Sequence, residues 1–191
     1  IIKNGIKIKK RLNKKNFKYF NIGMSARIND KKLHKLIIKA INKTTKKNRI
    51  KCFFAGDGEY KKKLKNYIYE NKIKNIIFDG QLNLVQLNKW YKKLDLYIQA
   101  TKGEGSSISL LEAINNHVPV ICSNVSGIKD MNLPNKKIIL FKNNEEDLLK
   151  KILFFYSMSK KQKERIVMDQ TKFLRKFHSV EDMLKKYLIV Y

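Results

Sequence analysis

Short apolar segments alternate with helical segments along most of this 191-residue chain, and no other feature restricts the possible folds as strongly. The apolar segments are rich in Ile, Val and Phe and have no polar face, which is typical of strands buried on both sides. They lie at residues 19–24, 50–55, 75–78, 96–100, 118–122 and 138–141. Because helical segments separate most of these strands, a parallel sheet is expected. The sequence therefore predicts an α/β domain with a doubly wound parallel sheet, covered by helices on both faces, over residues 17–155.

Helices are predicted at residues 32–46, 59–71, 84–93, 107–116, 145–156, 161–177 and 180–190. In the first of them, one stripe at helical spacing is apolar and consists of Leu33, Leu36, Ile37, Ala40 and Ile41. The last two helices follow the final strand. Residues 156–191 are therefore expected to form C-terminal helices that are appended to the sheet domain.

In doubly wound folds, ligands bind at the carboxyl ends of the strands, where loops lead into helices. Glycines lie near or after the carboxyl ends of the predicted strands, at Gly23, Gly56, Gly58, Gly80, Gly103, Gly105 and Gly127. Turns between strands and helices need glycine for their backbone angles in any case, so a single glycine carries little weight. Together they favour a ligand whose phosphates approach the backbone.

The stretch GEGSSISLLEA, at residues 103–113, places two carboxylates around a small turn and a helix start. Glu104 lies in the loop after the 96–100 strand, and Ser106 and Ser107 leave the first N–H groups of the next helix accessible to an anion. Glu112 is an acceptor suited to a vicinal diol such as a ribose. In the alternative interpretation, Glu112 closes a capping box with Ser109. A glycosidase pair is disfavoured, because eight helical residues span about 12 Å, beyond the usual 5–9.5 Å separation of such carboxylates.

The chain is strongly basic, with 43 Lys and Arg against 16 Asp and Glu and a net charge of +27. The charge is concentrated near the N-terminal end, where Lys9, Lys10, Arg11, Lys14, Lys15 and Lys18 cluster, whereas residues 101–150 are neutral on balance. This pattern permits a non-catalytic module that binds nucleic acid or an anionic membrane. The joint abundance of Lys, Ile and Asn is equally what an AT-rich genome produces. Neither zinc-finger spacing nor the aromatic pattern of an RNA-binding sheet accompanies the charge.

Cys52 and Cys122 fall in apolar strand segments and are expected to be buried free thiols, with no metal site and no disulfide. No apolar run approaches about 18 residues, so no membrane span is predicted, and no signal peptide is recognised. The expected location is the cytoplasm, with possible peripheral attachment to the inner face of the membrane. The chain begins with Ile1, and the expectation is that it is part of a longer protein.

The run EGSSISLLEAINNHVPVICSNVSG, at residues 104–127, resembles the E-x7-E signature of family 4 (group 1) retaining glycosyltransferases. NIGMSARINDKKLHKLIIKAI resembles that family's first strand–helix unit, with its phosphate-binding Arg and Lys at Arg27 and Lys32. IKCFFAGDGEYKKKLK and IIFDGQLN are similar to its second and third units, and IIKNGIKIKK to the linker entering its C-terminal domain. The resemblance covers nearly the whole chain and leaves the substrate open.

The resemblance implies a Rossmann-like half of a GT-B fold, the donor-binding C-terminal domain, with residues 1–16 as interdomain linker. The implied activity is retaining transfer of a sugar from a UDP- or GDP-sugar to a glycan or lipid-linked acceptor, without a metal or cofactor. By resemblance, Arg27 and Lys32 hold the diphosphate, Gln81 and Leu82 border the base, and Glu112 binds the ribose. Glu104 and the loop residues Gly105, Ser106, Ser107, Ile108 and Ser109 address the sugar and the phosphates. An N-terminal half would bind the acceptor, so this chain alone is expected to bind donor weakly and transfer little.

The sequence departs from the family pattern at four places. Leu33 replaces the glycine that usually follows the phosphate-binding lysine, and Lys31 could share that role. Ser106-Ser107 replaces an aromatic–Gly pair. His117 replaces a frequent glycine and is expected to be a packing or capping residue, and Asp130 stands where an acid is common in the family. A third possible function is that of a GT-B relative such as a nucleotide-sugar epimerase.

Overall fold

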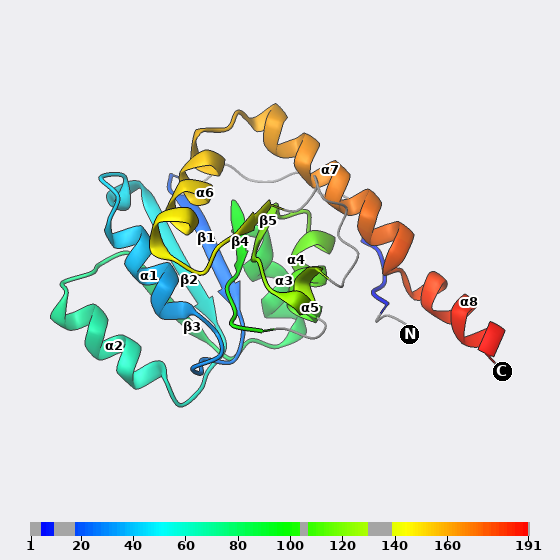
Figure 1. Cartoon of the computed structure of the whole chain (residues 1–191), viewed down its shortest axis with the longest axis horizontal. Coiled ribbons are helices and arrows are strands. Elements are labelled where there is room, and N and C mark those ends of the chain that lie inside the picture. The colour runs from blue at the N-terminus through cyan, green and yellow to red at the C-terminus, as the bar shows by residue number, and fades with distance from the viewer. Residues whose placement is uncertain (1–4, 10–17, 104–106, 130–138, 191) are drawn as a thin grey trace.

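The computed structural model describes residues 5–9, 18–103, 107–129 and 139–190, and its centre is a parallel sheet with helices on both faces (Figure 1). The strands are β1 (Phe20–Ser25), β2 (Ile50–Ala55), β3 (Ile76–Gly80), β4 (Leu96–Gln99), β5 (Val120–Ser123) and β6 (Ile139–Phe141). Each overlaps a predicted strand, and all adjacent pairs are parallel. The predicted fold class is confirmed.

The strand order β3-β2-β1-β4-β5-β6 places the first strand in the middle of the sheet. Strands β2 and β3 lie on one side of β1, and β4 lies on its other side, where Ile22 pairs with Leu96. The loops that follow β1 and β4 therefore leave toward opposite faces. In such sheets a crevice forms where the strand order reverses, at the carboxyl ends of these two strands.

The helices are α1 (His34–Asn42), α2 (Lys61–Glu70), α3 (Leu84–Lys92), α4 (Ile108–Asn115), α5 (Ser126–Lys129), α6 (Glu145–Ser157), α7 (Lys160–Phe177) and α8 (Val180–Val190). A 3₁₀ turn, η1 (Lys47–Arg49), precedes β2. One core cluster joins the sheet to α1, α2 and α6, and the other joins it to α3, α4, α5 and α7. Figure 1 shows α1 and α6 crossing in front of the sheet. Two apolar layers therefore stabilise the sheet, one on each face.

Side chains of β1 alternate between these two layers. Ile22 and Met24 are fully buried in the layer beneath α1 and α6. Gly23 points to the opposite face, where a Cβ atom would lie 2.8 Å from Leu94 Cδ2 and 2.9 Å from the Trp90 ring. The missing side chain thus lets α3 pack directly against the central strand.

Two helix ends differ from the prediction for tertiary reasons. Helix α1 begins at His34 instead of residue 32, because Leu33 N donates to Ala100 O at 3.0 Å and Lys102 N donates to Lys31 O at 2.9 Å. Residues 31–33 are held by the end of β4 and cannot adopt helical hydrogen bonding. Helix α1 also ends at Asn42, before η1. The short helix α5 was not predicted, since four residues are too few for a periodic pattern.

His117 and the two cysteines behave as the sequence predicts. His117 has a φ of 58° at the end of α4, and Val118 N donates to Ala113 O at 3.1 Å across it. This is the left-handed position that usually follows a helix, which explains why glycine is frequent there. Cys52 and Cys122 are buried free thiols. In the described ranges, no helix combines the length and apolarity that a membrane crossing requires.

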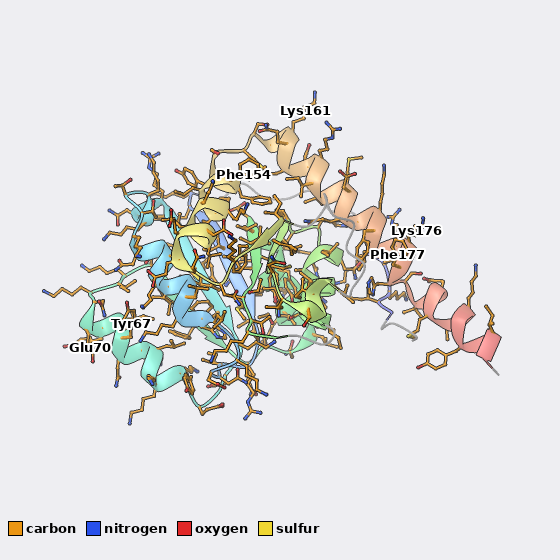
Figure 2. The ribbon with its side chains drawn as sticks, in the orientation of Figure 1. Tyr67, Glu70, Phe154, Lys161, Lys176 and Phe177 are labelled. Carbon is orange, nitrogen blue, oxygen red and sulfur yellow. The ribbon has the colours of Figure 1, made fainter. Side chains whose placement is uncertain are left out.

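The C-terminal helices and residues 5–9 lie together at one end of the domain. Helix α7 packs on α4, and Gln170 bonds both backbone groups of Val120 at the start of β5. Helix α8 extends away from the sheet beside the N-terminal segment, where Ile6 N donates to His178 O at 2.8 Å (Figure 1). Lys161 and Lys176 point outward from α7, as many basic side chains do from their helices (Figure 2).

Candidate functional site

Three loops at the carboxyl edge of the sheet line an open pocket of about 360 Å³. Its lining comes from the ends of β1, β2 and β3 and from α3, and consists of Ser25, Ala26, Arg27, Ala55, Gly56, Gln81, Leu82 and Leu87. Three predicted site residues, Arg27, Gln81 and Leu82, therefore lie in one pocket. A larger hollow of about 540 Å³ lies against α1 and α2, but none of the predicted site residues lines it.

Close contact between two backbone segments shapes this pocket. Gly56 has a φ of 128°, and a Cβ atom there would lie 2.2 Å from the Ala26 carbonyl oxygen. Ala26 N donates to Ala55 O at 3.0 Å, and Gly56 N donates to Gly80 O at 2.7 Å. Only glycine satisfies both the backbone angle and the contact. The three loops are therefore joined by backbone hydrogen bonds before any ligand arrives.

Arg27 carries the positive charge of the pocket. Its Nε lies 3.6 Å from Glu59 Oε2, and the two side chains are 74% and 55% exposed. An ion pair this exposed contributes little stability, so a ligand anion can replace the carboxylate at small cost. The guanidinium fork suits a phosphate, which it can bind through two parallel hydrogen bonds.

Lys32 lies at the same edge of the sheet, on the side of β1 that faces β4. It forms an antiparallel bridge with Thr101, directly after β4, and its N–H donates to Asn29 Oδ1 at 3.1 Å. The backbone at position 32 is thereby held beside Thr101, two residues after the end of β4. The loop after β4 was also predicted to supply Glu104, Gly105 and Ser106. These three predicted site residues lie outside the described residues.

Helix α4 begins at the other side of the crevice. Ser107 is its N-cap residue, with Oγ accepting from Leu110 N at 3.4 Å and lying 3.3 Å from Ser109 Oγ. The N–H groups of Ile108 and Ser109 belong to the first helical turn, where no preceding carbonyl can accept them within the helix. Together with the helix dipole, they favour a bound anion.

A buried polar network connects the end of β1 with the start of α4. The Tyr97 hydroxyl lies 3.2 Å from Ser25 O and 2.9 Å from Gln99 Oε1. Ser109 Oγ donates to the same Gln99 oxygen at 3.4 Å. The network joins the end of β1, two residues before Arg27, to the start of α4 at the same edge of the sheet.

Glu112 does not form the capping box that was considered as an alternative. Ser107 caps the helix instead of Ser109, and Glu112 Oε2 accepts a hydrogen bond from the Tyr91 hydroxyl at 3.2 Å. Its carboxylate therefore faces α3 rather than the backbone at the start of α4. Tyr91 was not among the predicted site residues, because its position depends on the packing of α3 against α4, which no local motif encodes.

Acidic, histidine and cysteine side chains are scattered over the described parts of the chain. No three of them gather there as metal ligands would. The positive groups of the site are Arg27, Lys32 and the first N–H groups of α4. These groups would favour an anion such as a diphosphate, and the apolar side chains of Leu82 and Leu87 line the neighbouring pocket.

The family model described as "Glycosyl transferases group 1" matches residues 6–172. Protein CapJ of Staphylococcus aureus is 35% identical over 103 residues, which are 53% of this chain and 26% of CapJ. The chain thus spans about a quarter of the length of this curated relative.

Three solved structures have similar folds. The catalytic domain of cholesterol-alpha-glucosyltransferase from Helicobacter pylori has a TM-score of 0.73 and 28% identity, over 83% of this chain and 98% of that one. TarM of S. aureus, in complex with UDP and other ligands, has a TM-score of 0.82 and 23% identity, over 98% of this chain and 38% of TarM. The C-terminal domain of a glycosyl transferase group 1 family protein (LpcC) from Francisella tularensis has a TM-score of 0.73 and 20% identity, over 84% and 87%. The chain therefore belongs to the group 1 glycosyl transferases, and it looks like the C-terminal domain of a GT-B enzyme.

Proposed function

We propose that this chain is the donor-binding half of a retaining glycosyltransferase that takes a UDP- or GDP-sugar as donor. The observation that carries the proposal is the pocket of Arg27, Gln81 and Leu82, which opens at the same sheet edge as the first amides of α4. Family membership supports sugar transfer in general, and the solved complex of TarM with UDP supports a nucleotide donor.

In this proposal the base lies against Gln81 and Leu82, and Glu112 binds the ribose. The diphosphate runs from Arg27 and Lys32 to the N–H groups of Ser107, Ile108 and Ser109. Negative charge grows on the departing diphosphate as the bond from the sugar C1 to its phosphate oxygen breaks and the oxygen keeps the electron pair. Fixed cations and oriented amides at that position lower the barrier and supply the charge that a metal ion would otherwise supply. Glu104 would hold hydroxyl groups of the transferred sugar.

The acceptor would bind outside this chain. The chain spans 38% of TarM, and a glycan or lipid-linked acceptor is expected to bind to another half of the enzyme. The chain alone should therefore bind donor weakly and transfer little. A place in the cytoplasm, at the inner face of the membrane, would bring such an enzyme to lipid-linked acceptors.

A basic module for nucleic acid or an anionic membrane is the second candidate, because the net charge is +27. Part of this charge is already paired inside the domain. Lys39 and Lys43 lie 3.2 and 2.6 Å from the carboxylate of Glu145, and Lys61 lies 2.7 Å from that of Asp57. The pocket has no role in this second function, so the two functions predict different effects of substitutions there.

Calorimetric titration of the 191-residue chain with UDP, GDP and their sugars tests the proposal. Arg27→Met should weaken the binding of the preferred nucleotide about tenfold, the scale of a charge-assisted hydrogen bond. Arg49→Met is the matched control, since Arg49 is exposed but precedes β2, at the opposite edge of the sheet. If neither nucleotide binds, or if both variants weaken binding equally with a steep salt dependence, the basic-module function is favoured.

A further inference from the structure

We propose that Tyr91 is a positioning residue, which orients the Glu112 carboxylate toward the ribose and makes the site prefer ribonucleotides over 2′-deoxyribonucleotides. The inference rests on the proposed function, in which Glu112 binds the ribose. It adds a buried residue from α3 that was not among the predicted site residues.

The Tyr91 hydroxyl lies at a junction between the pocket and α4. It donates to Glu112 Oε2 at 3.2 Å and lies 3.1 Å from the carbonyl oxygen of Ser109. Leu87, which precedes Tyr91 by one turn of α3, lines the pocket. Helix α3 therefore contacts both the pocket and the carboxylate of Glu112.

Burial makes this junction rigid. The Tyr91 side chain is fully buried, with its ring packed against Trp90 at 5.3 Å and Tyr97 at 5.8 Å between centroids. Burial raises the pKa of the Tyr91 phenol well above its ordinary value, so the hydroxyl keeps its proton and remains a donor. A carboxylate is a stronger acceptor than a carbonyl, so the single proton favours Glu112 over Ser109.

Lys9 adds a positive charge near the same carboxylate. Its ammonium is hydrogen-bonded to Asn88 and, at 3.2 Å, to Asn116 Oδ1, and its backbone N–H donates to Asn115 Oδ1 at 2.9 Å. Burial lowers the pKa of the Lys9 ammonium, and the charge of Glu112 opposes part of this shift. The Glu112 side chain is thus held by a hydrogen bond from α3 and lies in the electrostatic field of a cation from the N-terminal segment.

These restraints leave one carboxylate oxygen for a ligand. Oε2 is engaged by Tyr91, whereas none of the described residues donates a hydrogen bond to Oε1. A ribose hydroxyl that binds Oε1 gains more when the side chain is already ordered, because less conformational entropy is lost on binding. Loss of the Tyr91 hydroxyl should therefore weaken recognition of the diol specifically.

The test compares UDP with 2′-deoxy-UDP, and GDP with 2′-deoxy-GDP, by calorimetric titration of the chain. For the preferred pair, the wild-type chain should bind the ribonucleotide about tenfold more tightly than the deoxyribonucleotide. Tyr91→Phe keeps the ring and removes the hydroxyl, and should reduce this ratio to about twofold. Glu112→Gln should reduce the ratio similarly, and the double variant should add little, because both changes remove the same interaction.

Tyr97→Phe is the matched control for a purely structural effect. It removes a buried tyrosine hydroxyl from the neighbouring strand, one that contacts Ser25 and Gln99 but not Glu112. It should cost comparable stability in urea unfolding and leave the ribose-to-deoxyribose ratio at its wild-type value.

The outcomes separate the two proposals. If Glu112→Gln lowers the ratio and Tyr91→Phe does not, the role of Tyr91 is wrong while the ribose role of Glu112 stands. If neither variant changes the ratio, or if the wild-type chain binds neither pair, the ribose role fails and the inference fails with it. If Tyr97→Phe lowers the ratio as much as Tyr91→Phe, the effect is structural and the inference is overturned.

Discussion

Acid sensitivity at His34 is the prediction that the structure defines most quantitatively. His34 opens α1, is 1% exposed, and packs its ring against Phe54 at 4.9 Å between centroids. Its Nδ1 lies 3.2 Å from Lys32 O, and its buried Nε2 has no partner among the described residues. Burial lowers the pKa of His34 to about 4, although the bond to the Lys32 carbonyl opposes the shift.

The direction of the pH effect follows from the different pKa values of His34 in the unfolded and the folded chain. The unfolded chain binds a proton at His34 below about pH 6.5, whereas the folded chain excludes that proton until about pH 4. Between these values the unfolded state binds more protons, so the free energy of unfolding falls as the pH falls. The contribution of His34 to this loss is about 2 kcal/mol between pH 7 and pH 5.

Urea unfolding at pH 7 and pH 5, followed by the fluorescence of the single tryptophan, Trp90, measures this loss. His34→Gln replaces the imidazole with a side chain that does not titrate. Other groups titrate equally in both chains, so the variant should lose about 2 kcal/mol less than the wild-type chain over this range. Equal losses in the two chains would refute the burial argument for His34.

Two further predictions concern backbone conformation. Lys72 is exposed and has a φ of 51° just after α2. Lys72→Gly should therefore stabilise the fold by about 0.5–1 kcal/mol in urea unfolding, whereas the control Lys65→Gly, within α2, should destabilise it by about 1 kcal/mol. A loss of stability in Lys72→Gly would contradict the assigned backbone angle. Gly56→Ala should cost about 3 kcal/mol and weaken nucleotide binding, because the new Cβ atom would displace the Ala26 carbonyl at the pocket wall. A variant that is as stable as the wild-type chain would show that the two loops are not in contact there.

The sheet could be predicted from the sequence because each strand is recognised by its own composition. A strand that is buried on both faces has to be largely apolar, and β4 and β5, in which every residue is buried, are the clearest cases. The start of α1 could not be predicted in the same way. It depends on hydrogen bonds between Lys31 and Lys102 and between Leu33 and Ala100, which join segments far apart in the sequence.

The candidate site likewise contains residues that a local pattern predicts and one residue that depends on tertiary packing. Arg27, Gln81 and Leu82 follow strands, so strand prediction and the family resemblance together placed them at one sheet edge, where the structure joins them in a pocket. The roles of these residues and of Glu112 stay predictions. Tyr91 lies within a helix and carries no motif, and its bond to Glu112 exists only once α3 and α4 pack side by side on the sheet.

The central claim is that one diphosphate-containing ligand touches both walls of the crevice. The most direct measurement is an NMR titration of the chain with UDP and GDP, with the backbone amides of Gly56 and Gln81 observed on one wall and those of Ile108 and Ser109 on the other. The claim predicts that both pairs of signals shift along a single binding curve with one dissociation constant. Shifts confined to one wall, or two different dissociation constants, would contradict it.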